Sequence, residues 1–114
     1  MEVKYQRLVE ALKKADQAAK DADPGEDGGT CNFDSPVLHL PHVRSATRNA
    51  IAEAAGVALR PVHSWGAGYC HVGVTLHGQA GRRTAMVEAA AKSLYESLEK
   101  DGLPWSATIY YQMD

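Results

Sequence analysis

The sequence predicts one α+β domain in which a first helix precedes the element order β-α-β-β-α-β. Apolar residues repeat every three or four positions in three segments and every second position in others, and clusters of glycine and proline separate these segments. The length of 114 residues suits a single domain, and the content of 45% hydrophobic and 23% charged residues is typical of a globular protein.

Residues 1–22 contain the first predicted element, an amphipathic helix. Its apolar residues recur at helical spacing and are Tyr5, Leu8, Val9, Leu12, Ala15 and Ala19. Pro24 and Gly25 end it, because neither residue continues a helix well. The polar side carries charges of both signs, which is atypical of a membrane-surface helix. We therefore expect the apolar side to cover a sheet or to pair with a second copy of the chain.

A linker rich in glycine, proline and aspartate is predicted over residues 23–30, and a strand over Phe33–Leu40. Pro36 removes one hydrogen-bond donor from that strand, so we expect an irregular segment or a bulge there. The next helix is predicted from Val43 to Ala55, and Gly56 suits the position that follows the last helical residue.

Two strands and a turn are predicted next. The strand Val57–Ser64 is interrupted by Pro61, which favours an edge position in the sheet. Residues 65–68 form a short turn. The strand Tyr69–His77 shows the clearest alternation of the whole chain, with apolar side chains at every second position from Val72.

The last helix is predicted from Arg82 to about Lys100, and the last strand from Ser106 to Met113, with Gly102 and Pro104 between them. The apolar stripe of this helix consists of Met86, Val87, Ala90, Ala91, Leu94, Tyr95 and Leu98.

This element order is the split β-α-β pattern of ferredoxin-like domains, an antiparallel sheet in the strand order 4-1-3-2 with two helices on one face. The predicted organisation is an N-terminal helix at 1–22, a linker at 23–30 and a ferredoxin-like domain at 31–114. The other sheet face is expected to carry Val37, His39, Thr108 and Tyr110. The N-terminal helix or a second copy of the chain is expected to cover it, and we expect a homodimer or larger homo-oligomer.

Three segments have distinctive sequences: Gly-Gly-Thr-Cys-Asn-Phe-Asp at Gly28–Asp34, the glycine-rich turn before Arg82, and the C-terminal Tyr-Tyr-Gln-Met-Asp. In these segments the chain resembles small uncharacterised bacterial and prophage-type proteins. The resemblance covers part of the chain and implies no particular activity.

Charge is distributed unevenly along the chain, whose formal net charge is −2. Residues 31–84 hold five arginines against Asp34 and Glu53, a local charge of +3, together with all five histidines. A slightly acidic chain offers no general affinity for nucleic acid. The open sheet face also presents His71 and Gly73 where RNA-recognition domains place stacking aromatic residues, so we expect no nucleic-acid partner.

The first residues are charged, and no segment approaches about 18 consecutive apolar residues, so we expect neither a signal peptide nor a membrane span. Two cysteines, Cys31 and Cys70, are too few for a disulfide framework, and we expect reduced thiols in the cytoplasm. We expect no metal and no other cofactor, because the histidines do not follow a metal-ligand spacing. His39 is expected opposite His71 if the first and third strands pair in that register.

Cys31 is the candidate nucleophile of a small enzyme. In the predicted topology the start of the first strand lies beside the end of the third, which brings Cys31 near His77. A base at that distance lowers the pKa of a thiol and activates it. Cys70 opens a central strand and is expected in the core.

A glycine-rich turn that opens a helix is the clearest candidate binding site. The turn Gly78–Gly81 leads into Arg82 and Arg83 in the first helical turn, where free backbone N–H groups and guanidinium groups together favour an anion. The spacing is not that of a Walker phosphate-binding loop. The topology brings Gly29 and Thr30 to the same edge of the sheet.

The sequence thus predicts a small module that binds an anionic ligand or partner. The predicted ligand-binding residues are Gly29, Thr30, His77, Gly78, Gly81, Arg82, Arg83 and Gln112. Two other classes stay open: a small enzyme that uses Cys31 with His77, and a structural or interaction protein that acts as a homodimer. Tight turns with solvated arginines explain the same residues without any ligand.

Overall fold

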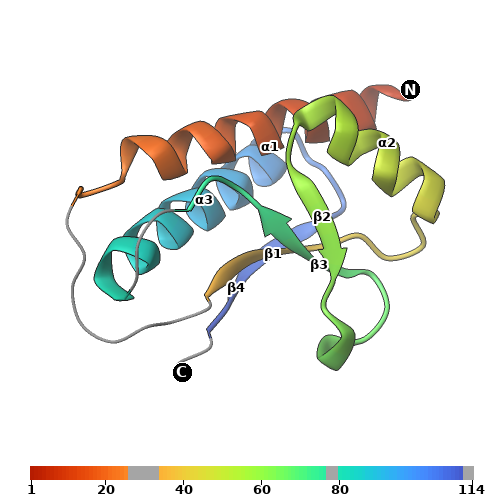
Figure 1. Ribbon diagram of the computed structural model, residues 1–114. Coiled ribbons are helices and arrows are strands. Elements are labelled where there is room, and N and C mark those ends of the chain that lie inside the picture. Colours follow the sequence, from red (N-terminus) through yellow and green to blue (C-terminus); the bar gives the residue numbers. More distant parts are fainter. Residues whose placement is uncertain (26–33, 77–79, 112–114) are drawn as a thin grey trace.

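The computed structural model describes residues 1–25, 34–76 and 80–111, and within these ranges it contains three α-helices, one short 3-10 helix and four strands (Figure 1). The elements are α1 (Val3–Asp21), β1 (Ser35–His39), α2 (Ser45–Ala55), β2 (Ala58–Pro61), η1 (His63–Trp65), β3 (Tyr69–Gly73), α3 (Ala80–Lys100) and β4 (Ser106–Tyr110). The predicted α+β class is confirmed.

The four strands form one antiparallel sheet in the order β2-β3-β1-β4, which becomes β4-β1-β3-β2 when counted from the β4 edge. Ser35 pairs with Tyr110, and Val37 pairs with His71. Because both partners of β1 run opposite to it, the start of β1 lies beside the ends of β3 and β4. This is the edge at which the sequence predicted a site.

All three helices lie on the same side of the sheet (Figure 1). The α1 helix packs mainly against α3 and also against α2. Leu8 and Leu12 of α1 share one hydrophobic core with Leu38 of β1 and Leu94 of α3, and all four are fully buried. The expectation that α1 covers the open sheet face is therefore wrong, because its apolar stripe joins the helix layer on the opposite side.

The core side chains follow the predicted periodicities. In β3, Cys70 and Val72 face the helices, which confirms Cys70 as a core residue, and in β1 the same face carries Leu38. Tyr95 departs from the predicted stripe of α3, since its side chain is 54% exposed. Leu94 and Leu98, four positions apart, lie on the buried face of α3, and Tyr95 is turned about 100° from Leu94 around the helix axis.

The β3 strand is shorter than predicted and ends at Gly73 instead of His77. Its alternating pattern continues, but the backbone leaves the sheet: the Val74 N–H donates to the Val72 carbonyl, and the Thr75 N–H donates to Asp16 Oδ1 of α1 at 2.6 Å. Because the Thr75 N–H donates to a helix side chain, it is not available for a hydrogen bond to a neighbouring strand. Residues 77–79 lie outside the described residues.

Proline and glycine act partly as predicted. Pro61 is the last residue of β2, which is an edge strand as expected. The irregularity expected at Pro36 is absent from β1, which is continuous over its described length. Pro36 pairs with Ile109 of β4, whereas pairing with β3 begins at Val37, so the missing donor interrupts no β1–β3 bond. Gly56 closes α2 with φ of 68°, as predicted.

Candidate functional site

A cavity of about 720 Å³ opens on the side of the sheet away from the helices. Its polar lining comes from all four strands and two further elements: Ser35, Arg60, His63, His71, Arg83 and Tyr110. The other lining residues are Pro61, Val72, Gly73, Val74 and Leu76, of which Val72 and Val74 also belong to the hydrophobic core. A volume of this size is typical of small-molecule sites.

The sheet register places four of these side chains on one face. Arg60 of β2 pairs with His71 of β3, which in turn pairs with Val37 of β1. Ser35 lies two positions before Val37 and therefore points to the same face, and it pairs with Tyr110 of β4. The four strands thus bring residues that lie as many as 75 positions apart in the chain to one place.

Arg83 reaches the cavity from the first turn of α3. Its Nε donates to the backbone carbonyl of Asp34 at 2.9 Å, which fixes the guanidinium at the start of β1. The predicted approach of the α3 N-terminus to the start of the first strand is therefore present in the described residues. The terminal nitrogens of Arg83 take no part in this bond.

Ser35 and His71 form a direct hydrogen bond within the cavity. Ser35 Oγ lies 2.6 Å from His71 Nδ1, and the Ser35 side chain is largely buried. Burial and the nearby Arg60 guanidinium both lower the pKa of His71 below its ordinary value. The imidazole is thus neutral near pH 7, and the tautomer of His71 decides whether its Nδ1 accepts a hydrogen bond from the Ser35 hydroxyl or donates one to it.

The charges of the cavity are of one sign. Among the described residues that line it, Arg60 and Arg83 are permanently cationic, His63 and His71 can become so, and none is a carboxylate. Asp34 directly precedes the lining residue Ser35 in the sequence. Its side chain is only 4% exposed and accepts a hydrogen bond from Thr84 Oγ1 at 3.4 Å. The described side chains that line the cavity therefore carry positive formal charge and no negative formal charge.

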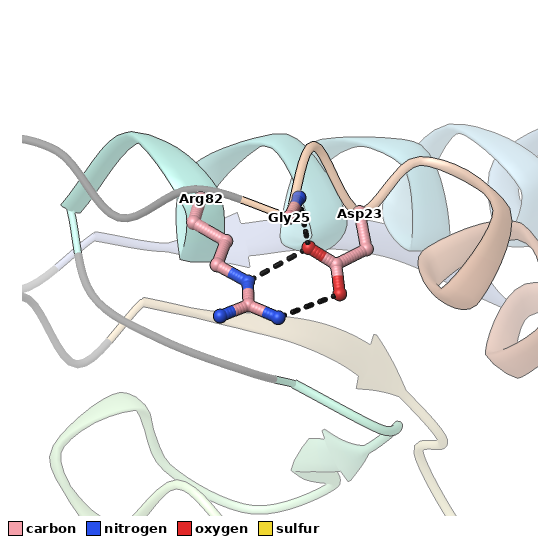
Figure 2. A network of polar contacts seen from close by, with 3 residues as sticks. All are labelled: Asp23, Gly25 and Arg82. Carbon is pink, nitrogen blue, oxygen red and sulfur yellow. Dashed lines mark hydrogen bonds and ion pairs between the residues drawn. The ribbon is translucent and has the colours of Figure 1, made fainter.

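Arg82 differs from its neighbour Arg83. Its Nε and Nη2 donate to Asp23 Oδ1 and Oδ2 at 2.8 and 3.0 Å, and the Gly25 N–H donates to the same carboxylate (Figure 2). Adjacent helical residues point about 100° apart, so the two arginines reach different surroundings. Arg82 is engaged with the end of α1 and is not among the residues that line the cavity.

The other predicted site residues lie mostly outside the described part of the chain. These are Gly29, Thr30, Cys31, His77, Gly78 and Gln112, and the Cys31–His77 pair stays a prediction for that reason. Gly81 lies in the first turn of α3. The expected register of His39 opposite His71 is wrong by two residues, since His39 pairs with Tyr69. The alternation of apolar and polar residues in a strand predicts which face of the sheet a residue occupies, but not which residue of the neighbouring strand it pairs with.

Sequence patterns did not single out Ser35, Arg60, His63 or Tyr110 as site residues, although Tyr110 was placed on the open face. Arg60 follows the core residue Leu59 and therefore points to the opposite face of β2, which is a signal that was available. His63 belongs to η1, which replaces the end of the predicted strand Val57–Ser64, and no periodicity predicts that change.

Metal and thiol chemistry find no support in the described residues. No three His, Cys, Asp or Glu side chains of this part of the chain converge on one point. Burial raises the pKa of the Cys70 thiol, although the neighbouring Arg48 partly opposes this shift, so Cys70 is protonated near pH 7.

No helix in residues 1–25, 34–76 and 80–111 is long and apolar enough to span a bilayer. Comparison of the chain with models of protein families, with curated proteins and with solved structures gives no match. The inference of function therefore rests on the cavity and its residues.

Proposed function

We propose that this protein is a binding module for a small anionic ligand, which it holds in the cavity on the open face of the sheet. The observation that supports this most directly is the pairing of two arginines from distant elements, Arg60 and Arg83, around a space with no carboxylate among its described lining residues. An arginine pair in a partly enclosed space binds phosphate or carboxylate groups through several N–H donors.

The remaining polar groups of the cavity suit the same task. The Ser35 hydroxyl and the Tyr110 phenol are neutral hydrogen-bond donors and acceptors. His63 is exposed and His71 is partly buried, and a bound anion favours the charged form of His71, whose charge then adds to those of Arg60 and Arg83. Gly73 lines the cavity without a side chain, and a Cβ at this position would lie 3.0 Å from Ala58 Cβ of β2.

We propose in addition that the fold belongs with the ferredoxin-like domains. The strand order counted from β4, the antiparallel pairing of all neighbours and the positions of α2 after β1 and α3 after β3 support this assignment. The α1 helix is an addition that extends the helix layer. The homodimer also stays a proposal, which sedimentation at micromolar concentration tests: a monomer mass excludes it.

Isothermal titration with inorganic phosphate and with sulfate tests the binding function. We expect Arg60→Ala and Arg83→Ala each to weaken binding by about tenfold or more, since each removes a charge-assisted contact. Arg44→Ala is the matched control, because Arg44 is exposed beside α2 and does not line the cavity. Binding of neither anion by the unaltered protein, or equal loss in the control, contradicts the proposal.

The hydrogen bond between Ser35 and His71 supports a second candidate, an esterase. Ser35 Oγ would attack an ester carbonyl carbon while its proton passes to His71 Nδ1 and then to the departing alkoxide, and water would later hydrolyse the acyl-serine. The described residues supply no carboxylate that orients His71, which is why binding is the leading proposal. A fluorophosphonate probe that labels the protein but not Ser35→Ala favours the esterase, and no labelling excludes it.

A further inference from the structure

Five rings form a continuous row on the open face of the sheet, and we call it the ring row: His39, Trp65, Tyr69, His71 and Tyr110. His39 stacks on Tyr69 with centroids 4.0 Å apart, and Trp65 contacts Tyr69 edge-on at 5.5 Å. Trp65 also contacts Tyr110 at 5.5 Å, and Tyr110 meets His71 at 5.3 Å. The contacts of Trp65 with Tyr69, of Trp65 with Tyr110 and of Tyr110 with His71 have separations within the range of favourable aromatic pairs, and His39 and Tyr69 stack more closely.

Trp65 is the last residue of η1, which lies within the connection between β2 and β3. In Figure 1 this connection extends below the sheet, on the side away from the helices. The Trp65 side chain bridges Tyr69 of β3 and Tyr110 of β4, and it remains 37% exposed. Beneath the row, Val37 of the central strand β1 is fully buried. The row thus covers the open face within one chain while it keeps an accessible aromatic surface.

The ring row and the cationic cavity meet at two shared residues. Tyr110 and His71 line the cavity and are also the last two rings of the row. The Tyr110 ring contacts Trp65 at an interplanar angle of 45° and His71 edge-on at 79°, and these two contacts restrict its position before any ligand arrives. A rigid ring beside two arginines combines a stacking surface with an anion site.

We propose that the anionic ligand of the cavity is a free mononucleotide, an inference that rests on the proposed binding function and specifies its ligand. The phosphate contacts Arg60 and Arg83, and the base stacks on the Tyr110 ring, which Trp65 supports. A nucleotide joins a flat π-system to a phosphate over a short distance, and this combination matches what the cavity offers at its two sides. A simple inorganic anion leaves the aromatic side of the site unused.

The distribution of charge favours a single nucleotide over a nucleic-acid strand. A strand is bound along a groove in which cations follow successive phosphates. Along the ring row away from the cavity, the described open-face positions of β4 are Ser106 and Thr108, which carry no charge. The chain as a whole has a net charge of −2. One phosphate position, at Arg60 and Arg83, is therefore what the described part of the open face provides.

The test compares AMP and UMP with ribose 5-phosphate, which carries the phosphate and sugar without a base. Base–aromatic stacking strengthens binding by at least about fivefold per base, so we expect both nucleotides to bind at least that much more tightly than ribose 5-phosphate. Tyr110→Leu is expected to abolish this ratio and to leave ribose 5-phosphate affinity within about twofold, whereas Tyr110→Phe retains the ratio because it retains the ring. Tyr95→Leu is the matched control, since Tyr95 is an exposed tyrosine of α3 outside the cavity.

Three results overturn the nucleotide assignment. Equal affinity of the unaltered protein for AMP and ribose 5-phosphate shows that the base makes no contact, and it leaves the anion-binding function intact. Loss of the ratio in Tyr95→Leu places the stacking elsewhere. A single-stranded octanucleotide that binds more than about a hundredfold tighter than AMP identifies a strand as the ligand instead. If no phosphate compound binds at all, the proposed function itself fails.

Discussion

Arg82 and Asp23 form a two-point ion pair across 59 residues of sequence, with Nε–Oδ1 and Nη2–Oδ2 distances of 2.8 and 3.0 Å (Figure 2). The pair joins the end of α1 to the first turn of α3, and both side chains are more than three-quarters buried. The sequence predicted that Arg82 and Arg83, in the first turn of this helix, both bind an anion. The structure separates them: Arg82 stabilises the arrangement of two helices, and Arg83 lines the cavity.

Breaking the Arg82–Asp23 pair is expected to lower the free energy of unfolding by about 1–2 kcal/mol, because each partner leaves a partly buried charged group behind. Urea unfolding of Arg82→Ala, Asp23→Ala and the double variant gives the coupling between the two residues, which we expect to be near 1 kcal/mol. Lys92 and Glu96 form the matched control, because their ion pair is exposed on α3 at 3.9 Å. A coupling no larger than that of the control contradicts this prediction.

Asp16 is expected to act as the cap that ends β3. Asp16→Ala removes the acceptor of the Thr75 N–H and is predicted to lower stability by about 1–2 kcal/mol, whereas Asp16→Asn retains an acceptor and loses less. Thermal and urea unfolding measure both variants. Equal stability of the unaltered protein and Asp16→Ala shows that the bond contributes nothing to the fold.

The same residue predicts a dependence of stability on acid. Burial alone raises the pKa of the Asp16 carboxyl, but the Thr75 hydrogen bonds and the nearby Lys20 outweigh it, and the pKa is lowered. A carboxyl whose pKa is lower in the folded protein stabilises it above the unfolded value and loses this contribution as pH falls through the folded pKa. We therefore expect the difference between the unaltered protein and Asp16→Asn to shrink below about pH 4.

His71 predicts a second dependence of stability on pH, which arises from a base that loses its proton more easily in the folded protein. Its pKa is lowered by burial and by Arg60, so below the ordinary histidine value of 6.5 the unfolded chain binds more protons than the folded chain. The free energy of unfolding should rise with pH up to about 6.5 and gain nothing from His71 above it. Urea unfolding between pH 5 and 8 measures this, and His71→Gln should remove the His71 part. An unchanged slope in that variant contradicts the prediction.

Anion binding should raise the pKa of His71 again. Arg60, Arg83 and His63 line the cavity together with His71, and the positive charge of the arginines disfavours the charged form of His71. A bound anion offsets this repulsion and favours the imidazolium, so binding takes up a proton. Sulfate is the suitable probe because its own charge is constant in this range. We expect its affinity to be several-fold higher at pH 5.5 than at pH 8 if the pKa of His71 rises by about one unit on binding, with about tenfold as the upper limit. His71→Gln should flatten most of this dependence, and a stronger affinity at pH 8 would exclude the mechanism.

Much of the fold follows from local patterns in the sequence. The helical spacing from Tyr5 to Ala19 predicted α1, and Gly56 predicted the end of α2, because each depends on the conformational preference of a few consecutive residues. The edge position of β2 followed from Pro61, which cannot donate to a ladder. The approach of the start of the first strand to the last helix followed from the order of the elements alone.

The site itself depends on which distant residues meet, and only the tertiary structure decided that. Alternation placed His71 and Tyr110 on the open face, but the register that sets His71 opposite Val37 and beside Arg60 arises from the pairing of three strands. The position of Trp65 over that face and the end of β3 at the Asp16–Thr75 bond likewise depend on contacts between separate segments. Such contacts leave no period in the sequence, because the residues that make them are chosen by packing in space rather than by their spacing along the chain.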